Sequence, residues 1–548
     1  MIKAFHMKPL IKYLIAFAVI GIAPACKKNF LDRPPIDQVT SGNFYKTNEE
    51  IRAATGPLYN IVWFDYNDKA FMAFGEARGG NLNSNDRTAY IQFSVNSTDQ
   101  STLLPGYKSF YKIVAQTNTI MAAIKNATNS TASDAVKREG IAECRFMRAM
   151  AYYYLVSNWG AVPIVYDNVS QLSNELRRNN IEDVWQFIIR DLTYAANNLP
   201  AVPYARGRLS KWSAEGMLAR MYLTRAGLGG TGSRKQSDLD SAKFYAGNVI
   251  TKSGLTLLPN YANLFRGAYN NSDHVNPNPE ALFALQWAPT NNPWGVNNSF
   301  QAYVAFDPAI TQTGDGWGAA QGVSADLVKY YMANPDDSIR RKATTMFHRD
   351  HYPELNQAAG GTTVTGTGMA YIKKYVVGSP ADNGGKGNFM AAYINTYMLR
   401  LAEVYLIYAE AVLGNSGSTA DASALQAFNA VRARAGVAPK TSLTFADIFL
   451  EKRIELAMEG VAWYEILRWY YFNPAAAKAY VLAQDRGNYT ITYVTGTNAP
   501  RQYNTTYTSA HFTFTDQTVY LPFPEVEMNI APGLSQPPVP FDFSVLTD

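Results

Sequence analysis

Long stretches with helical periodicity recur along most of this chain, and they limit the folds that it can adopt. Residues 106–127 carry apolar side chains at a spacing of three to four, which places them on one side of a helix. Similar patterns cover residues 134–157, 181–199, 210–226, 238–252, 397–413, 422–435 and 444–469. Short turns, such as the glycine-rich 227–230, separate neighbouring stretches. The sequence therefore predicts a mainly α protein of antiparallel helical pairs, tetratricopeptide-like or arranged as an irregular bundle.

Residues 255–390 interrupt this pattern, because they are rich in Asn, Gly and Pro. A structureless loop of that length is uncommon inside a compact domain. We therefore predict a large irregular inserted region of loops, short helices and short strands, with one brief helix at 324–333. Beyond the helices, alternating polar and aromatic or β-branched residues at 489–520 predict a β-hairpin or two. The proline-rich end from Leu521 is typical of extended chain.

These patterns divide the chain at approximate boundaries. Residues 1–25 form a leader, and 26–548 form the mature domain. Within that domain we assign helical repeats to about 40–254 and 391–475, the insertion to about 255–390, and the hairpin and tail to about 485–548.

The beginning of the chain has the pattern of an export signal. Three lysines precede a short apolar run at 13–22, which is followed by small residues and Cys26. The run is too short for a membrane-spanning helix, which needs about 20 apolar residues. Small residues before Cys resemble a bacterial lipobox, so we predict that Cys26 is acylated and holds the protein on a membrane. The alternative is an ordinary secretory signal with a cysteine there by chance.

Charge and cysteine content exclude two classes of protein. Three of the 49 basic residues lie in the leader, which leaves 46 against 44 acidic residues. Such a balance gives no basic field for nucleic acid, so we expect no nucleic-acid partner. With Cys26 committed to lipid, Cys144 is the one cysteine left, so no intramolecular disulfide is expected. Cys144 is most simply a small buried apolar residue.

Carboxylates at helical spacing raise the question of catalysis. Glu451, Glu455 and Glu459 share one helix face, with Arg453 and Arg468 nearby. Two of them could form the acid/base pair of a glycoside hydrolase. Ion pairing between helices is the alternative that we favour, because nothing in the sequence separates one carboxyl pKa from another. Glu403 and Glu410, with Arg400, receive the same interpretation.

No motif indicates a metal or cofactor site. His348, Asp350, His351 and Glu354 could supply two or three ligands, but structural zinc usually needs four. The sequence has no HExxH, no CxxC, no phosphate-binding Gly-rich loop and no nucleophile elbow. We therefore expect no metal and no cofactor.

Eight short segments along the chain form one ordered set of motifs. They are residues 29–35 (NFLDRPP), 142–149 (AECRFMRA), 158–164 (NWGAVPI), 397–406 (YMLRLAEVYL), 431–436 (VRARAG), 451–460 (EKRIELAMEG), 521–524 (LPFP) and 529–536 (NIAPGLSQ). In this order they resemble the SusD/RagB family of outer-membrane lipoproteins. Each is a weak pattern alone, but their order across nearly the whole mature chain is specific. The resemblance implies a helical half packed against a variable half, without catalysis. It also implies capture of an oligosaccharide, delivery to a SusC-like TonB-dependent transporter, and a lipid-anchored place on the outer membrane facing the exterior.

Two loops are candidate ligand sites. Trp294 and Trp317 stand beside glycines in Asn- and Gly-rich loops, where few neighbours can bury a ring. Residues 79–90 are rich in amide and charged side chains, and in the resembled family loops from these two regions meet at a glycan site. We therefore predict that the ligand is bound by Asn83, Asp86, Arg87, Tyr90, Trp294 and Trp317. The alternative is that the tryptophans only pin the insertion to the helices, and it stays open for Trp294 and Trp317. Trp287 follows an apolar run, so we assign it to packing.

Two rival functions stay open on the sequence. A peptide-binding protein of the same family would use the same aromatic residues, since Tyr and Trp serve both kinds of ligand. A glycoside hydrolase would need a carboxylate pair that turns over a glycan.

Overall fold

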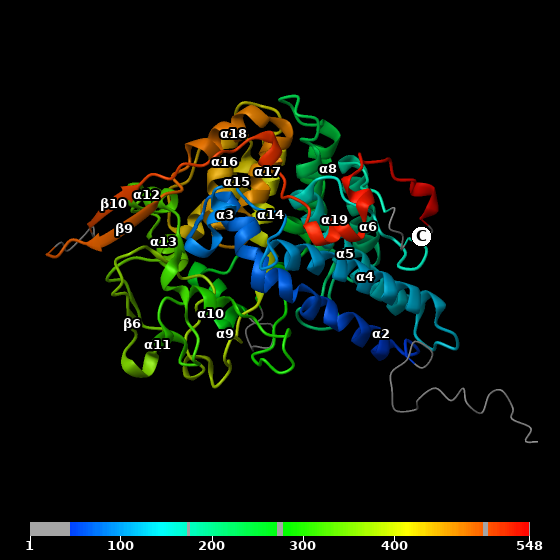
Figure 1. Ribbon diagram of the computed structural model, residues 1–548, viewed down its shortest axis with the longest axis horizontal. Helices are drawn as coiled ribbons and strands as arrows, with labels where there is room; N and C mark the ends of the chain where they lie inside the picture. Colours follow the sequence, from blue (N-terminus) through cyan, green and yellow to red (C-terminus); the bar gives the residue numbers. More distant parts are fainter. Residues whose placement is uncertain (1–43, 172–175, 271–277, 497–501, 547–548) are drawn as a thin grey trace, which may run out of the picture.

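The computed structural model describes residues 44–171, 176–270, 278–496 and 502–546 (Figure 1). The predicted leader and Cys26 lie outside the described residues. The chain is mainly helical, as the sequence predicts. Among the described residues, no helix combines the length and apolar character that crossing a membrane requires.

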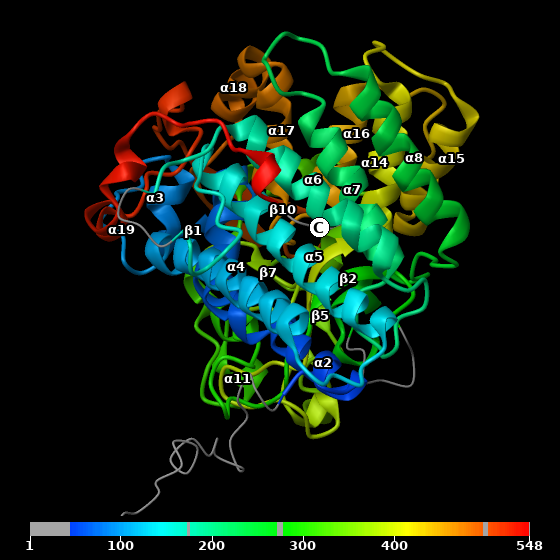
Figure 2. The ribbon, with the colours of Figure 1, turned by 90° about the vertical axis from the view of Figure 1, so that its right-hand side faces the viewer.

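Antiparallel helices packed in sequence order form one side of the molecule (Figure 2). They are α2 Asn48–Thr55, α4 Leu103–Asn126, α5 Asp134–Trp159, α6 Ile181–Asn198, α7 Lys211–Arg225, α8 Gln236–Lys252, α14 Leu401–Leu413 and α15 Ala422–Ala435. Each of α4 to α8 packs against the next in the chain, and α8 packs against α14. α5 is buried on nearly all sides and includes Cys144. A helix buried all round belongs in the centre of such an array.

The ends of these helices follow the expected capping chemistry. Ser133 accepts a hydrogen bond from the Val136 backbone amide and is the N-cap of α5. Ser210 caps α7 through a reciprocal pair with Ser213. At the end of α15, Gly436 adopts the left-handed conformation with φ 73°.

The helix predicted at 444–469 is two helices, α16 Phe445–Glu455 and α17 Ala462–Phe472. The chain turns between them, with φ 75° at Gly460. Buried Glu76 accepts the backbone amides of Met458, Gly460 and Val461, which replaces the helical hydrogen bonds lost at the break. This partner lies almost 400 residues earlier, so the local pattern could not reveal the break. α18 Pro474–Ala483 follows and packs on α17.

The stretch predicted as helix from residue 397 begins as strand β8 Thr396–Arg400, and α14 starts only at Leu401. β8 pairs antiparallel with β2 Ala281–Leu285, with Leu285 opposite Thr396. Tertiary pairing therefore overrides the helical pattern here. This two-stranded sheet joins the inserted region to the helices.

The inserted region contains short helices and strands, as the sequence predicts. The helices are α9 Gly267–Asn270, α10 Phe300–Val304, α11 Pro308–Thr311, α12 Ala325–Ala333 and α13 Ser338–Thr344. A four-stranded sheet has the order β1 Leu82–Ser84, β3 Gln321–Val323, β7 Tyr371–Ile372 and β4 Thr345–Met346. β5 His351–Tyr352 pairs with β6 Thr362–Thr363. Because β1 comes from the first hundred residues, this sheet ties the early loop to the insertion.

The C-terminal part forms a hairpin and then an extended tail. β9 Asn488–Tyr493 and β10 Tyr503–Thr508 pair antiparallel, with Asn488 opposite Thr508, and project from the body (Figure 1). The tail carries α19 Glu525–Ile530 and lies along the early helices. The Trp159 indole donates to the carbonyl of Pro522, 3.0 Å away, so the tail covers the end of α5. The assigned domain boundaries stay a prediction.

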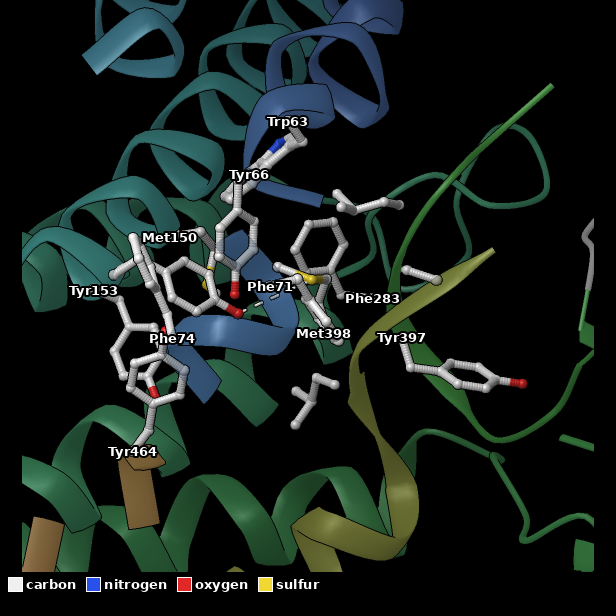
Figure 3. Close-up of a cluster of buried hydrophobic side chains, with 14 of the residues drawn as sticks. Trp63, Tyr66, Phe71, Phe74, Met150, Tyr153, Phe283, Tyr397, Met398 and Tyr464 are labelled. Atoms are coloured by element: carbon white, nitrogen blue, oxygen red, sulfur yellow. Dashed lines mark hydrogen bonds between the residues drawn. The ribbon is translucent and has the colours of Figure 1, made fainter. Parts of the chain in front are cut away.

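A π-helical segment, η4 Tyr66–Ala70 and η5 Met72–Ala77, lies at the junction of the helices and the insertion. Its rings and those of nearby chain pack with residues from α5, α17, β2 and β8 (Figure 3). The cluster includes Trp63, Tyr66, Phe71, Phe74, Met150, Tyr153, Phe283, Met398 and Tyr464. Neighbouring α3 Thr88–Ile91 follows the 3₁₀ turn η6 Asn85–Arg87. Packing against this core therefore fixes the loop at residues 79–90, which we call the early loop.

Candidate functional site

Two of the three tryptophans in the insertion are open to solvent. Trp294 is 50% exposed and Trp317 is 46% exposed, whereas Trp287 is 4% exposed. The Trp287 indole donates to the Thr396 hydroxyl at 3.0 Å, so it packs against β8 as expected. Large apolar rings left open in this way are unusual on a folded surface and mark candidate contact sites.

Trp294 lies on a loop that packs against Phe64. Gly295 has φ 100°, and its amide donates to the side chain of Asn297 at 2.9 Å. The Trp294 ring meets Phe64 edge to face, with centroids 5.3 Å apart. One edge of the indole is therefore fixed, while the rest stays open.

Trp317 is positioned by tight backbone contacts. Its amide donates to the carbonyl of Ala302 at 2.7 Å. A Cβ on the next residue, Gly318, would lie 2.4 Å from the Val304 backbone, so only glycine fits there. The ring contacts those of Tyr303 and Phe389, each at a centroid distance of 5.9 Å.

Phe389 links the two tryptophan loops. Phe389 is 37% exposed, and its carbonyl accepts a hydrogen bond from the side-chain Nδ2 of Asn291 at 3.2 Å. We call Trp294, Tyr303, Trp317 and Phe389 the aromatic face. Rings of this kind offer large apolar surfaces that can stack on the C–H side of a sugar or on an apolar side chain.

Polar groups lie beside the aromatic face. The Lys69 ammonium is 3.4 Å from the Tyr303 hydroxyl and 2.6 Å from the Asp68 carboxylate. Arg87 lines a small hollow together with Lys69 and Tyr303. Hydrogen-bond donors are thus available next to the rings, as a polar ligand requires.

The other predicted residues of the early loop have different positions. Asn83 is 7% exposed and pairs with Gly322 in the β1–β3 ladder, and Asp86 is exposed on η6. Tyr90 is 3% exposed, and its hydroxyl donates to Asp99 at 2.7 Å. Burial and the bond to Asp99 raise the pKa of Tyr90 well above its usual value. Tyr90 is therefore a packing residue in this structure, because its ring packs against that of Phe74 in η5, with centroids 5.8 Å apart.

The sequence missed Tyr303, Phe389 and Lys69. Phe389 follows a run of Asn and Gly at 383–388, the signal that pointed to Trp294 and Trp317, so it could have been found. Tyr303 and Lys69 lie in helical turns, where an aromatic or basic residue carries no such signal.

The candidate catalytic carboxylates are buried in ion pairs. Arg400 contacts Glu455 at 2.6 Å and Glu459 at 2.7 Å. Arg340 contacts Glu451 at 2.5 Å. These arginines come from β8 and α13, whereas the sequence analysis named Arg453 and Arg468. Only Glu451 and Glu455 lie on α16, because Glu459 falls in the break before α17.

Charge pairing keeps Glu455 and Glu459 ionised. Burial alone would raise the pKa of Glu455, but Arg434, Arg400 and Arg340 outweigh it and lower the pKa to about 2. The pKa of Glu459 is also lowered. A general acid needs a raised pKa, so this cluster lacks the asymmetry that glycoside cleavage uses.

The second pair of glutamates is also paired, with partners other than Arg400. Glu403 binds Arg220 with both carboxylate oxygens, and Glu410 contacts Arg234, Lys452 and Arg468. Each of these carboxylates joins helices that are distant in sequence. They serve the packing of the helical array.

The candidate metal ligands at residues 348–354 do not converge on one point. Asp350 pairs with Arg341, Glu354 lies near Lys373 at 3.6 Å, and a His348 ring nitrogen accepts the Tyr493 amide at 3.0 Å. Within the described part of the chain, no group of three or more His, Cys, Asp or Glu residues could hold a metal ion.

Known families and structures match this chain along its length. A family model described as the SusD family matches residues 279–539, and one described as starch-binding associating with outer membrane matches residues 30–223. A SusD-like protein of Bacteroides ovatus is 36% identical over 551 residues, which cover 97% of this chain and 98% of that protein.

Solved structures share the fold. One crystal structure with a xylogluco-oligosaccharide has a TM-score of 0.82 at 36% identity, covering 90% of this chain and 99% of that one. A laminarin-binding SusD-like protein has a TM-score of 0.64 at 21% identity, covering 89% and 98% of the two chains.

Proposed function

This chain belongs to the SusD family, and on that premise we propose that it is a non-catalytic glycan-binding lipoprotein of the outer membrane. It would capture an oligosaccharide at the cell surface and deliver it to a SusC-like TonB-dependent transporter. The anchor would be the acylated Cys26, and the family supports a place on the outer membrane facing the exterior.

The observation that carries the proposal is the open aromatic face. Trp294 and Trp317 are about half exposed, although each loop is held by specific hydrogen bonds and glycine contacts. Rings fixed in this way lose little conformational freedom when a ligand stacks on them. The relative that is 36% identical and was crystallised with a xylogluco-oligosaccharide supports a glycan as the ligand.

Polar side chains at the edge of the face suit the hydroxyl groups of a sugar. Lys69 and Arg87 are donors, and the Tyr303 hydroxyl both donates and accepts. We assign Trp294, Trp317, Phe389 and Tyr303 to stacking, and Lys69 and Arg87 to hydrogen bonding. Asp86 is close in sequence to Arg87 and stays a proposed contact.

The absence of catalysis is part of the proposal. It is supported by the buried, ion-paired state of Glu451, Glu455 and Glu459, which leaves no tuned acid and base in the cluster that the sequence singled out.

Isothermal calorimetry tests the proposal. The mature chain from Lys27 onward is titrated with a panel of oligosaccharides, including xylogluco- and laminari-oligosaccharides, and with peptides. We expect saturable heat with a glycan and no cleavage product after long incubation. Saturable heat with peptides alone would make the protein a peptide-binding member of the family, and product formation would make it an enzyme.

A further inference from the structure

A second hollow lies next to η6, and its lining includes Asn85 of that turn. It has a volume of about 300 Å³ and runs between the β1–α3 loop and the base of the β9–β10 hairpin. We call it the polar groove and define it by six of its lining residues: Asn83, Ser84, Asn85, Gln92, Asn488 and His511.

Both walls of the groove are fixed. On one side, β1 is held by pairing with β3, with Asn83 opposite Gly322. On the other side, buried Arg486 donates to the carbonyls of Ala77, Arg78 and Ile91, which ties the base of the hairpin to the early loop. The shape of the groove is therefore set by strand pairing and buried hydrogen bonds.

The groove contains a buried polar group without a protein partner. Ser84 is 2% exposed, and among the described residues its hydroxyl finds no hydrogen-bond partner. The amide side chain of Asn83, 7% exposed, lines the same groove. Most buried polar groups in proteins are paired, because an unpaired one costs free energy. The unpaired Ser84 hydroxyl in the wall of the groove therefore points to a polar ligand.

The lining indicates which ligand. Amide side chains of Asn83, Asn85, Gln92 and Asn488 both donate and accept, as does the Ser84 hydroxyl, and this matches the dual character of sugar hydroxyls. The one Arg in the lining, Arg486, already uses its guanidinium on backbone carbonyls and on Gln484. A neutral, hydroxyl-rich unit fits this lining better than an anion or a cation.

The groove and the aromatic face meet at η6. Asn85 lines the groove, and Arg87, two residues later in the same 3₁₀ turn, lines the hollow shared with Lys69 and Tyr303. At about 2 Å of rise per residue, the two positions are only about 4 Å apart along the turn. One chain-like ligand can therefore contact both.

We propose that the polar groove is a further subsite for neutral glycosyl residues, so that a long oligosaccharide extends from the aromatic face across η6 into the groove. This inference depends on the proposed function and adds to it a second contact region and a preference for longer ligands.

Calorimetry with ligands of graded length tests this inference on the same protein. The probes are a xylogluco-oligosaccharide series and a laminari-oligosaccharide series. We expect the wild-type protein to bind longer members more tightly. Ser84→Ala and Asn488→Ala each remove a groove hydrogen bond and are expected to weaken the longest bound member about threefold to tenfold, with the shortest unchanged.

Two measurements separate binding from folding. Asn504→Ala makes the same change as Asn488→Ala on the exposed side of β10, outside the groove, and should bind every length as wild type does. Ser84→Ala removes a buried unpaired hydroxyl, so its melting temperature should not fall.

The possible failures can be told apart. If the wild type binds long oligosaccharides and both groove variants match it, the groove is not a subsite, and the aromatic face stands. If groove variants weaken short and long ligands equally, the length preference is wrong. If the wild type binds neither series, the groove inference falls, and the remaining panel decides the proposed function.

Discussion

Replacing Trp317 by alanine should remove a measurable part of glycan affinity. A tryptophan side chain presents up to about 250 Å², and with 46% of it exposed about 100 Å² is open for a ligand. At about 25 cal/mol per Å² of apolar area, full coverage is worth about 2.5 kcal/mol. Because a sugar face is only partly apolar, we expect a loss of about 1.5–2.5 kcal/mol, or a 10- to 60-fold rise in Kd.

Calorimetry against the best oligosaccharide of the panel measures this loss. Phe244→Ala is the matched control, because this ring on α8 is 60% exposed but lies outside the aromatic face. Trp317→Phe keeps an aromatic ring and should restore part of the affinity. Thermal unfolding of each variant shows whether the protein is still folded under the conditions of the titration.

The reasoning is refuted if Trp317→Ala binds as wild type does while its melting temperature is unchanged. It is also refuted if Phe244→Ala loses as much affinity as Trp317→Ala, because exposed rings would then matter irrespective of place.

Three further predictions concern the fold around the site. Gly460→Ala should destabilise the protein by about 2–4 kcal/mol in urea unfolding, because its Cβ would lie 2.5 Å from the Phe71 ring at a φ of 75°. Glu455 should make stability sensitive to acid: its contribution of about 3 kcal/mol is complete above pH 4.5 and is lost as the pH falls toward 2, since its folded pKa is lowered from 4.5 to about 2. Urea unfolding at pH 6 and pH 3 should show a smaller difference for Glu455→Gln than for wild type. Tyr90→Phe should cost about 1 kcal/mol of stability and leave glycan affinity unchanged, as measured by urea unfolding and calorimetry.

Each of these has a contrary outcome. Gly417→Ala, at a glycine with open space around it, should be nearly neutral, and an equal cost at both glycines would contradict the packing argument. An unaltered pH dependence in Glu455→Gln would mean that other carboxylates dominate acid unfolding. A loss of glycan affinity in Tyr90→Phe would show that Tyr90 contributes to ligand binding and is not only a packing residue.

The helical array was largely predictable because its information is local. Apolar periodicity located α4 to α8 and α15 within a few residues, and capping residues such as Ser210 and Gly436 are visible in the sequence. Errors occurred where a distant partner replaces local hydrogen bonds. β8 is extended because β2 pairs with it, and the break before α17 exists because Glu76 accepts three amides there.

The candidate site was predictable only in part. Glycine- and asparagine-rich flanks identified Trp294 and Trp317, whose exposure the structure then gives as 50% and 46%. The same reasoning overestimated Tyr90, because a loop residue can still face the core. Tyr303 joins the aromatic face only through the packing of α10 beside the Trp317 loop.

Local sequence patterns specify the helical class, the positions of the main helices and the two exposed tryptophans. These features depend on periodicity and on backbone freedom, which neighbouring residues set. The pairing of carboxylates with arginines, and the side chains that meet near η6, follow instead from how distant segments pack. Such contacts join residues more than a hundred positions apart, such as Arg400 with Glu280 or Asn83 with Gly322. These contacts contribute stabilising free energy only after the chain has folded, so no local sequence pattern predicts them.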